Sequence, residues 1–412
     1  MPVVTSHAAL AERFGRAAPG GAASDAAGMT ALVSSIAVKV LTTSPDLVAE
    51  VAAGRMERGA LEGMILKEAE GERIRFGLYR EELVRRAFDF MFGYGPLQEL
   101  IEDETVSDID GTRFDEFSLK RDGERRKADV RFPDERTFDA YCRLVVIRNR
   151  GILNENDSHC RVTDEAKRLR INVAIPPRNV TGPSISIRKH RRTCLGLDGL
   201  AAAGMLTEPL AARLGSLARS GRSVLVCGKG AAGKTTLLRA LIKACPEMER
   251  VLVVESDAEI FPEKPYCIQQ RIRKKNEGGR PVTLRDLVAD GLTMSLDTYC
   301  IGEIVGDEAY EFLRAAFSGH RCLATLHAEG AADALDRLVS LARPATHGEG
   351  ERTLKRMAGT CVDDVIYLER FRVAEWLSVE GFDDEGERFR FHTVWREARK
   401  GGEAAPDPAE GA

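Results

Sequence analysis

The sequence predicts an α/β protein of two domains, the second of which contains a largely parallel sheet covered by helices. The 412 residues suit two packed cores, because one domain typically takes roughly 100–200 residues. Short apolar runs at 223–227, 251–254, 299–301 and 322–326 are each followed by a stretch with helical spacing. Such alternation of strand and helix is typical of parallel sheets.

The composition is that of a soluble globular protein, with 43% hydrophobic and 30% charged residues. The formal net charge of −4 gives no support to a basic surface, so we do not expect nucleic acid as a direct ligand. The nine cysteines include no Cys-x-x-Cys pair, which predicts neither a zinc site nor a disulfide framework and fits a reducing cytoplasm. No signal peptide and no run near the ~20 apolar residues of a membrane span is recognised. We expect a cytoplasmic protein whose contact with a membrane is peripheral.

The order of segments along the chain follows from composition and spacing. The two ends are expected to be flexible, because they are too poor in apolar residues to order themselves. Leu32, Ile36 and Val40 recur at helical spacing, and residues 169–175 alternate as a strand does. We therefore expect, in order, a tail at 1–28, a helical region at 29–95, an N-terminal α/β domain at 96–192, a linker at 193–199, a second domain at 200–397 and a tail at 398–412.

The strongest chemical signal is a phosphate-binding loop at residues 228–235, which read Gly-Lys-Gly-Ala-Ala-Gly-Lys-Thr. A predicted strand precedes the loop and a predicted helix follows it, a context that a chance match in a Gly-rich loop would not supply. Glycines let successive N–H groups point at phosphate oxygens, while Lys234 supplies charge to the β- and γ-phosphates and the Thr235 hydroxyl suits Mg²⁺. The expected nucleotide-binding residues are Gly228, Lys229, Gly230, Ala231, Ala232, Gly233, Lys234, Thr235 and Thr236.

Acidic residues follow two of the other predicted strands. Glu255 and Glu259 come after the run at 251–254, where carboxylates can reach a metal or polarise the attacking water. A solvated acidic turn is the alternative. Glu303 follows the run at 299–301, the position for an acid that holds Mg²⁺ through water or acts as a base, rather than a plain strand-end glutamate.

Two histidines and two basic clusters remain. His327 lies at the carboxyl end of the fourth run, beside the expected γ-phosphate, and we favour phosphate sensing over a satisfied polar residue for it. For His320 both interpretations stay open. The clusters at 188–192 and 271–275 are either solvated faces or a source of arginines that stabilise phosphate charge.

These motifs together resemble the secretion ATPase superfamily of type II and type IV secretion, in particular its CpaF/TadA-type and conjugation-type ATPases. The resemblance rests on the phosphate loop, the acids at 255–259, the segment Leu-Thr-Met-Ser-Leu-Asp-Thr-Tyr-Cys-Ile-Gly-Glu at 292–303 and the closing Thr-Leu-His-Ala. It covers roughly residues 92–345. It implies a hexameric ring in which an N-terminal domain caps a RecA-like P-loop NTPase domain, with ATP and Mg²⁺ in the hinge.

The same resemblance implies a motor that powers pilus assembly, conjugation or secretion at the inner face of the cytoplasmic membrane. Its partners would be inner-membrane platform or secretion-channel proteins. Carried over by position, the resemblance assigns phosphate and Mg²⁺ binding to Lys234 and Thr235, the acidic box to Glu255 and Glu259, the Walker B acid to Glu303, the histidine box to His327 and an N-terminal-domain arginine near the γ-phosphate to Arg170.

The chain departs from the family pattern at several positions. Ser256 stands where the acidic box usually has Asp, and residues 293–297 replace the usual Arg-x-x-Pro-Asp. Val305 replaces the arginine after the Walker B acid, and Cys322 and Leu323 replace the glycine and serine of the histidine box. The source of a transition-state arginine therefore stays open. A nucleotide-gated assembly module with weak hydrolysis is one alternative function, and a DNA-translocating motor of the same fold is another.

Overall fold

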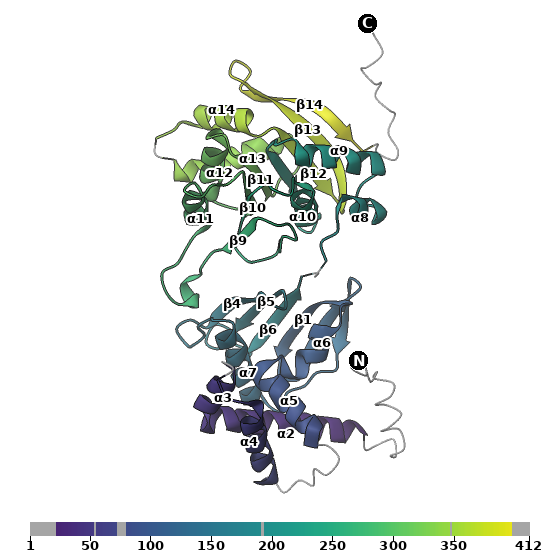
Figure 1. The fold of residues 1–412 in the computed structure, drawn as a ribbon, viewed down its shortest axis with the longest axis vertical. Coiled ribbons are helices and arrows are strands. Elements are labelled where there is room, and N and C mark those ends of the chain that lie inside the picture. Colours follow the sequence, from purple (N-terminus) through teal and green to yellow (C-terminus); the bar gives the residue numbers. More distant parts are fainter. Residues whose placement is uncertain (1–21, 53–54, 72–79, 191–192, 347, 398–412) are drawn as a thin grey trace. The chain divides into compact units, whose positions relative to one another are not determined.

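The computed structural model describes residues 22–52, 55–71, 80–190, 193–346 and 348–397. These residues form two compact units (Figure 1). The first ends at His190 and also includes residues 276–278, and the second contains the remaining described residues from 193 onward. Each unit has its own sheet.

The first unit begins with helices. Ile36 and Val40, which the helical spacing singled out, are both buried on the first of them. That helix already starts at Ala22, inside the segment predicted as a tail. Alanine is the strongest helix former, so an Ala-rich stretch extends a helix without an apolar period. The helices are α2 (Ala22–Thr43), α3 (Pro45–Ala52), α4 (Arg58–Gly71), α5 (Arg80–Phe92), α6 (Gln98–Glu102) and α7 (Glu135–Arg148).

The sheet of the first unit has six antiparallel strands in the order β3-β2-β1-β6-β5-β4. Its register places Leu119, Ile109, Ile187 and Ile171 in one row across four strands, and all four are buried. Alternation along each strand thus gives the sheet one apolar face. The strands are β1 (Val106–Arg113), β2 (Glu116–Arg121), β3 (Glu124–Ala128), β4 (His159–Asp164), β5 (Leu169–Ala174) and β6 (Ser184–Lys189).

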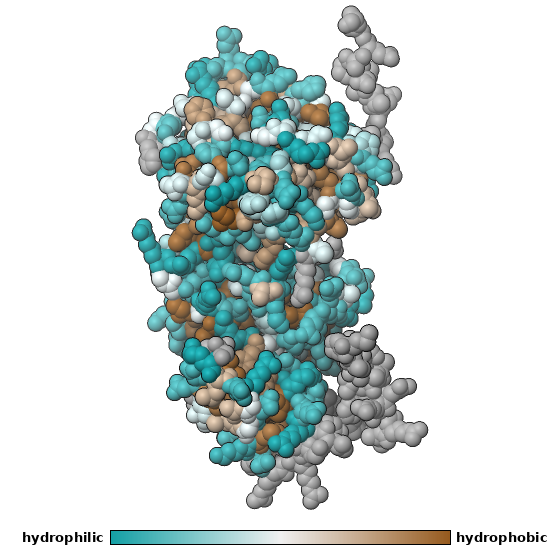
Figure 2. Space-filling model, in the orientation of Figure 1, coloured by the Kyte–Doolittle hydropathy of each residue, from teal (hydrophilic) through white to brown (hydrophobic). Residues whose placement is uncertain are grey.

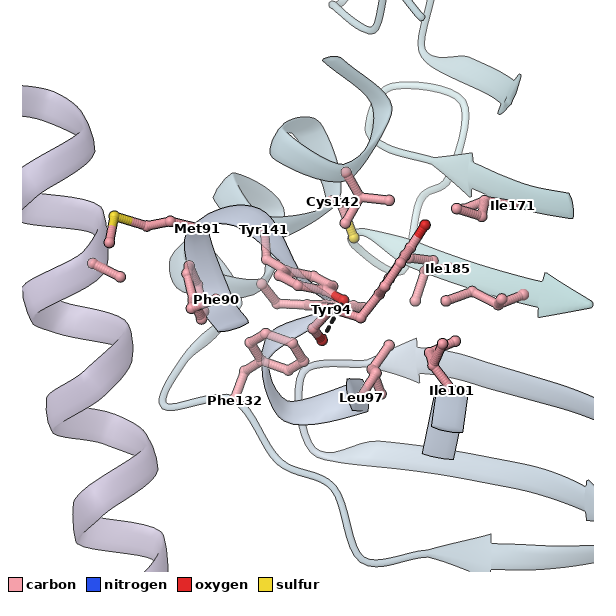
Figure 3. Packing of buried hydrophobic residues seen from close by; sticks show 14 of the residues in the cluster. Phe90, Met91, Tyr94, Leu97, Ile101, Phe132, Tyr141, Cys142, Ile171 and Ile185 are labelled. Atoms are coloured by element: carbon pink, nitrogen blue, oxygen red, sulfur yellow. Dashed lines mark hydrogen bonds between the residues drawn. The ribbon is translucent and has the colours of Figure 1, made fainter. Parts of the chain in front are cut away.

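One hydrophobic core joins the helices of the first unit to its sheet. Figure 3 shows Phe90, Tyr94, Phe132 and Tyr141 packed together in this core. The Tyr141 hydroxyl donates a hydrogen bond of 2.9 Å to the Tyr94 carbonyl oxygen, and the rings of Phe132 and Tyr141 lie 4.8 Å apart. The segments expected as a helical region and a separate α/β domain therefore share a single core.

The second unit is built on an eight-stranded sheet in the order β14-β13-β12-β7-β11-β10-β8-β9. The six strands from β12 to β9 are parallel, and β13 and β14 add an antiparallel edge. The predicted largely parallel sheet is confirmed. The strands are β7 (Val224–Gly228), β8 (Val251–Glu255), β9 (Cys267–Arg271), β10 (Thr298–Ile304), β11 (Arg321–Leu326), β12 (Asp364–Glu369), β13 (Arg372–Asp383) and β14 (Arg388–Arg396).

Two hydrophobic cores contain side chains from the two faces of this sheet. The first helix begins at Leu197, inside the predicted linker, because Leu197 and Leu200 are buried in one of these cores. The helices are α8 (Leu197–Ala202), α9 (Glu208–Arg219), α10 (Lys234–Ala244), α11 (Leu284–Gly291), α12 (Glu308–Phe317), α13 (Asp333–Ala342) and α14 (Glu351–Cys361).

The predicted tails lie mostly outside the described residues, which leave out 1–21 and 398–412. Over the part of the chain that the structure describes, no helix is both long and apolar enough to cross a membrane. Figure 2 shows hydrophilic residues over most of the visible face, with hydrophobic residues scattered among them. Scattered apolar residues of this kind are normal on a protein surface.

Candidate nucleotide-binding site

The predicted phosphate loop joins the end of β7 to the start of α10. Its backbone enters the left-handed region at Ala231, with φ 60°, and at Gly233, with φ 97°. At Gly228 a Cβ atom would lie 2.4 Å from the carbonyl oxygen of Leu368 on β12, so only glycine fits there. Gly233 is the N-cap of α10 and has no side chain to cap it. The N–H groups of the first helical turn are thus available to an anion.

Lys234 opens α10 with its side chain folded back into the loop. It is buried, and its Nζ atom donates to the carbonyl oxygens of Gly228, at 3.1 Å, and Lys229, at 3.2 Å. Burial lowers the pKa of this ammonium group, and the Glu303 carboxylate opposes the shift. A phosphate group entering the loop would therefore meet a cation that is already positioned and has lost most of its water shell.

Glu303 and His327 approach the same lysine from two adjacent parallel strands, β10 and β11. Oε1 of Glu303 lies 2.9 Å from Nε2 of His327 and 3.9 Å from Nζ of Lys234. Nε2 of His327 lies 3.4 Å from Nζ of Lys234. Both partners of the lysine keep about half of their side-chain surface exposed, 44% for Glu303 and 51% for His327. The structure thus gathers a cation, a carboxylate and an imidazole at the mouth of the loop.

Glu255 ends β8 and is 4% exposed. Its Oε1 atom accepts hydrogen bonds from the amides of Glu259, at 3.2 Å, and Ile260, at 3.0 Å, while Oε2 accepts one of 2.7 Å from Gln269. Burial raises the pKa of the Glu255 carboxyl to about 7, and the hydrogen bonds work in the opposite direction. The alternative of a solvated acidic turn is therefore wrong for Glu255, which holds the following turn in place.

Gly302 provides the space for this buried carboxylate. A Cβ atom at Gly302 would lie 2.8 Å from Cγ of Glu255. The carbonyl oxygen of Gly302 also accepts a 2.6 Å hydrogen bond from Thr325 on the neighbouring strand. Gly302 directly precedes Glu303, so the packing around Glu255 fixes the backbone that carries the exposed acid.

Asp257 and Lys274 form a largely buried ion pair that the sequence did not predict. The side chains of Asp257 and Lys274 are only 6% and 15% exposed. A solvated face is therefore the wrong interpretation of the 271–275 cluster at Lys274. Gln269, which holds Glu255, was also missed, because only the parallel pairing of β8 with β9 brings it there. No local sequence pattern marks either contact.

The remaining sequence candidates lie elsewhere. His320 precedes β11, at the end of that strand opposite to His327, and its ring meets Tyr299 edge-on with centroids 5.1 Å apart. His320 is thus a packing residue. Arg170 belongs to the first unit, on β5, where it pairs in register with Arg188 on β6.

The chain matches the profile of the family described as "Type II/IV secretion system protein" over residues 143–358. A Mycobacterium tuberculosis protein whose name assigns it provisionally to conjugal transfer is 31% identical over 273 residues, which are 62% of this chain and 77% of that protein. Protein VirB11 of Agrobacterium fabrum is 31% identical over 147 residues, which are 35% of this chain and 43% of that protein.

Two solved ATPase structures align with part of this chain. The VirB11 ATPase of Brucella suis is 21% identical, with a TM-score of 0.35, and the match covers 73% of this chain and 95% of that one. The ATPase DotB of Legionella pneumophila is 18% identical, with a TM-score of 0.46, and the match covers 72% of this chain and 77% of that one.

Proposed function

The chain belongs to the type II/IV secretion system protein family, and from this premise we propose that it is a Mg²⁺-dependent ATPase that drives a transport or assembly apparatus. One observation carries the proposal. Lys234, Glu303 and His327 meet within hydrogen-bond or ion-pair distance at the mouth of a phosphate-binding loop. That arrangement suits the binding and cleavage of a terminal phosphate.

The loop residues fit a triphosphate. The glycine-lined turn and the uncapped start of α10 offer N–H groups to the phosphate oxygens, and Lys234 balances their charge. The Thr235 hydroxyl, at the first turn of the helix, and the Glu303 carboxylate supply the oxygen ligands that Mg²⁺ prefers, the second through water. When bound, Mg²⁺ would neutralise charge that develops on the β- and γ-oxygens.

Hydrolysis then needs a water molecule aligned with the γ-phosphorus. Glu303 is exposed enough to accept a hydrogen bond from such a water and to take its proton as the bond to phosphorus forms. The bond between the γ-phosphorus and the bridging oxygen breaks, and ADP and phosphate leave. Next to Glu303, His327 can donate to a γ-phosphate oxygen, while Glu255 holds the turn that carries Glu259.

An additional positive charge at the γ-phosphate remains to be supplied. Val305 occupies the family's usual arginine position and is 58% exposed. We propose that Arg170 of the first unit provides this charge, as an arginine finger does. Removal of such a residue lowers turnover far more than nucleotide binding.

The wider role is proposed from the relatives. The names of the matched proteins refer to conjugal transfer and to VirB11. We propose that the chain forms a homo-oligomeric ring, with six subunits as the expected number, that acts at the inner face of the cytoplasmic membrane. Its partners would be platform or channel proteins of a type IV secretion, conjugation or Tad-type pilus apparatus. Domain motion of the ring during ATP hydrolysis would drive that apparatus.

Phosphate release by the full-length chain with ATP and Mg²⁺ tests the proposal. We expect turnover by the native chain and loss of turnover in Lys234→Ala. The matched control Lys355→Ala, whose lysine lies on α14 and pairs with Asp336 on α13, should keep native turnover. Absence of turnover in the native chain, with ring formation still dependent on ATP, would favour the nucleotide-gated assembly module instead.

A further inference from the structure

The turn between β12 and β13 has an unusual backbone. Its two residues, Arg370 and Phe371, lie between the paired residues Glu369 and Arg372. Both are in the left-handed region, with φ 47° and 64°. Hairpins of this kind strongly prefer Asn and Gly at these two positions, because larger side chains are strained there. Bulky residues persist in such conformations mainly where the surroundings require them, often at functional sites.

The strained turn lies against the phosphate loop. A Cβ atom at Gly233 would lie 3.0 Å from Cδ2 of Phe371 and 3.0 Å from Cε of Met205. Both side chains therefore contact the residue that directly precedes Lys234. Met205 is 2% exposed, and its carbonyl oxygen accepts a hydrogen bond from Val373 just after the turn, so methionine and hairpin are held together. Phe371, in contrast, is 43% exposed.

The order of strands gives the orientation of a bound nucleotide. Glu303 and His327 reach Lys234 from β10 and β11, which lie on one side of β7 in the strand order, while β12 lies on the other side of β7. The reacting γ-phosphate belongs beside Glu303 and His327. The other end of the nucleotide, its ribose and base, is therefore directed away from them, past Gly233 toward Phe371.

We infer that the exposed face of Phe371, backed by Met205, stacks against the base of the bound nucleotide. This inference rests on the proposed ATPase function and extends it to base recognition. An aromatic ring attracts the flat face of a base without reading its edges, so the contact distinguishes a nucleoside phosphate from a polyphosphate that has no base. The left-handed turn fixes the ring at the edge of the loop before the ligand arrives.

Titration calorimetry of the full-length chain with two probes, ADP and inorganic tripolyphosphate, tests this contact. In Phe371→Ala we expect ADP to bind about tenfold more weakly, the scale of one base–aromatic stack, while the affinity for tripolyphosphate is unchanged. Phe371→Trp should keep the native affinity for ADP. The matched control is Phe317→Ala, which removes another exposed aromatic, 60% exposed at the end of α12.

A fourth variant separates binding from folding. Asn adopts the left-handed region readily, so Phe371→Asn should keep or raise the Tm and still lose about tenfold in ADP affinity. Equal weakening of both probes, or native ADP affinity in Phe371→Ala and Phe371→Asn, would overturn the inference. Because the readout is binding, a chain that binds ADP as expected but never releases phosphate would contradict the proposed function alone.

Discussion

Nε2 of His327 lies 2.9 Å from Oε1 of Glu303, and both atoms face the ammonium group of Lys234. Glu303 is the last residue but one of β10 and His327 directly follows β11, so the parallel pairing of these strands brings the two side chains together. The imidazole and the carboxylate are thus within hydrogen-bond distance of one another. A phosphate at Lys234 would compete for the histidine and leave the carboxylate to a water molecule.

Loss of the Glu303 negative charge should lower turnover strongly and spare nucleotide binding. In Glu303→Gln we expect phosphate release to fall by about 10²-fold or more, the usual contribution of a catalytic acid or base. ADP affinity should stay close to native, because Lys234 and the loop amides remain. Rates and calorimetry on the same protein provide the measurement. The control is Glu351→Gln on α14, which should match the native rate, and a similar match by Glu303→Gln would refute the assignment.

The buried carboxyl of Glu255 should make stability depend on pH. Burial raises the pKa in the folded chain from 4.5 to about 7, so between these values the folded state binds more protons than the unfolded state. Stability must then fall as pH rises through this window, by at most about 3 kcal/mol. Glu255→Gln has no carboxyl group to lose this proton. Its stability relative to the native chain should therefore rise between pH 5 and pH 8. Urea denaturation at both pH values measures the gain, and a constant difference would exclude the raised pKa.

Replacing only one member of the ion pair between Asp257 and Lys274 should lower the stability of the folded chain. Lys274→Met leaves the Asp257 carboxylate buried without this partner, and we expect a loss of about 3 kcal/mol in the free energy of unfolding. The double variant Asp257→Asn/Lys274→Met should recover part of it, because no charge is then left behind. As a comparison, Arg343→Met removes an exposed pair with Glu351 and should change little. Additive losses in the double variant would show that the two side chains do not depend on each other.

Two glycine substitutions should have opposite effects. Gly302→Ala places a methyl group 2.8 Å from Cγ of Glu255, and we expect it to cost about 1–3 kcal/mol and to slow hydrolysis through the adjacent Glu303. Gly63→Ala, inside α4, meets nothing within 4 Å and should add about 0.5–1 kcal/mol by favouring the helix. Thermal unfolding of both variants measures this, and a stabilised Gly302→Ala would show that the strand yields easily.

Local patterns in the sequence were sufficient for the strands that carry the site. The loop motif and the ends of parallel strands predicted that Lys234, Glu303 and His327 would share one edge, because such ends meet at the same side of a sheet. Contacts between segments that are distant in the sequence could not be predicted from local patterns. The burial of Glu255 under Gln269 depends on the pairing of β8 with β9, and the position of Phe371 depends on the pairing of β12 with β7.

The starts of two helices differ from the expected ones for a different reason. The start of α2 at Ala22 follows the helix propensity of alanine rather than an apolar periodicity. The helix α8 begins at Leu197 because Leu197 and Leu200 are buried in a hydrophobic core. Both effects depend on what a residue packs against or on weak preferences summed over a segment.

The contacts of Tyr94 link the early helices of the first unit to its sheet. Its hydroxyl donates to Asp164 on β4 over 2.7 Å, and its carbonyl oxygen accepts the bond from Tyr141 on α7. A chain that began after Tyr94 would lose both bonds and the ring of Phe90, which lies 5.7 Å from the ring of Tyr141 and helps to cover it. The early helices are thus no detachable module. We therefore expect a chimera of two relatives to keep this core intact only when the residues from Val33 to Ile187 are exchanged together.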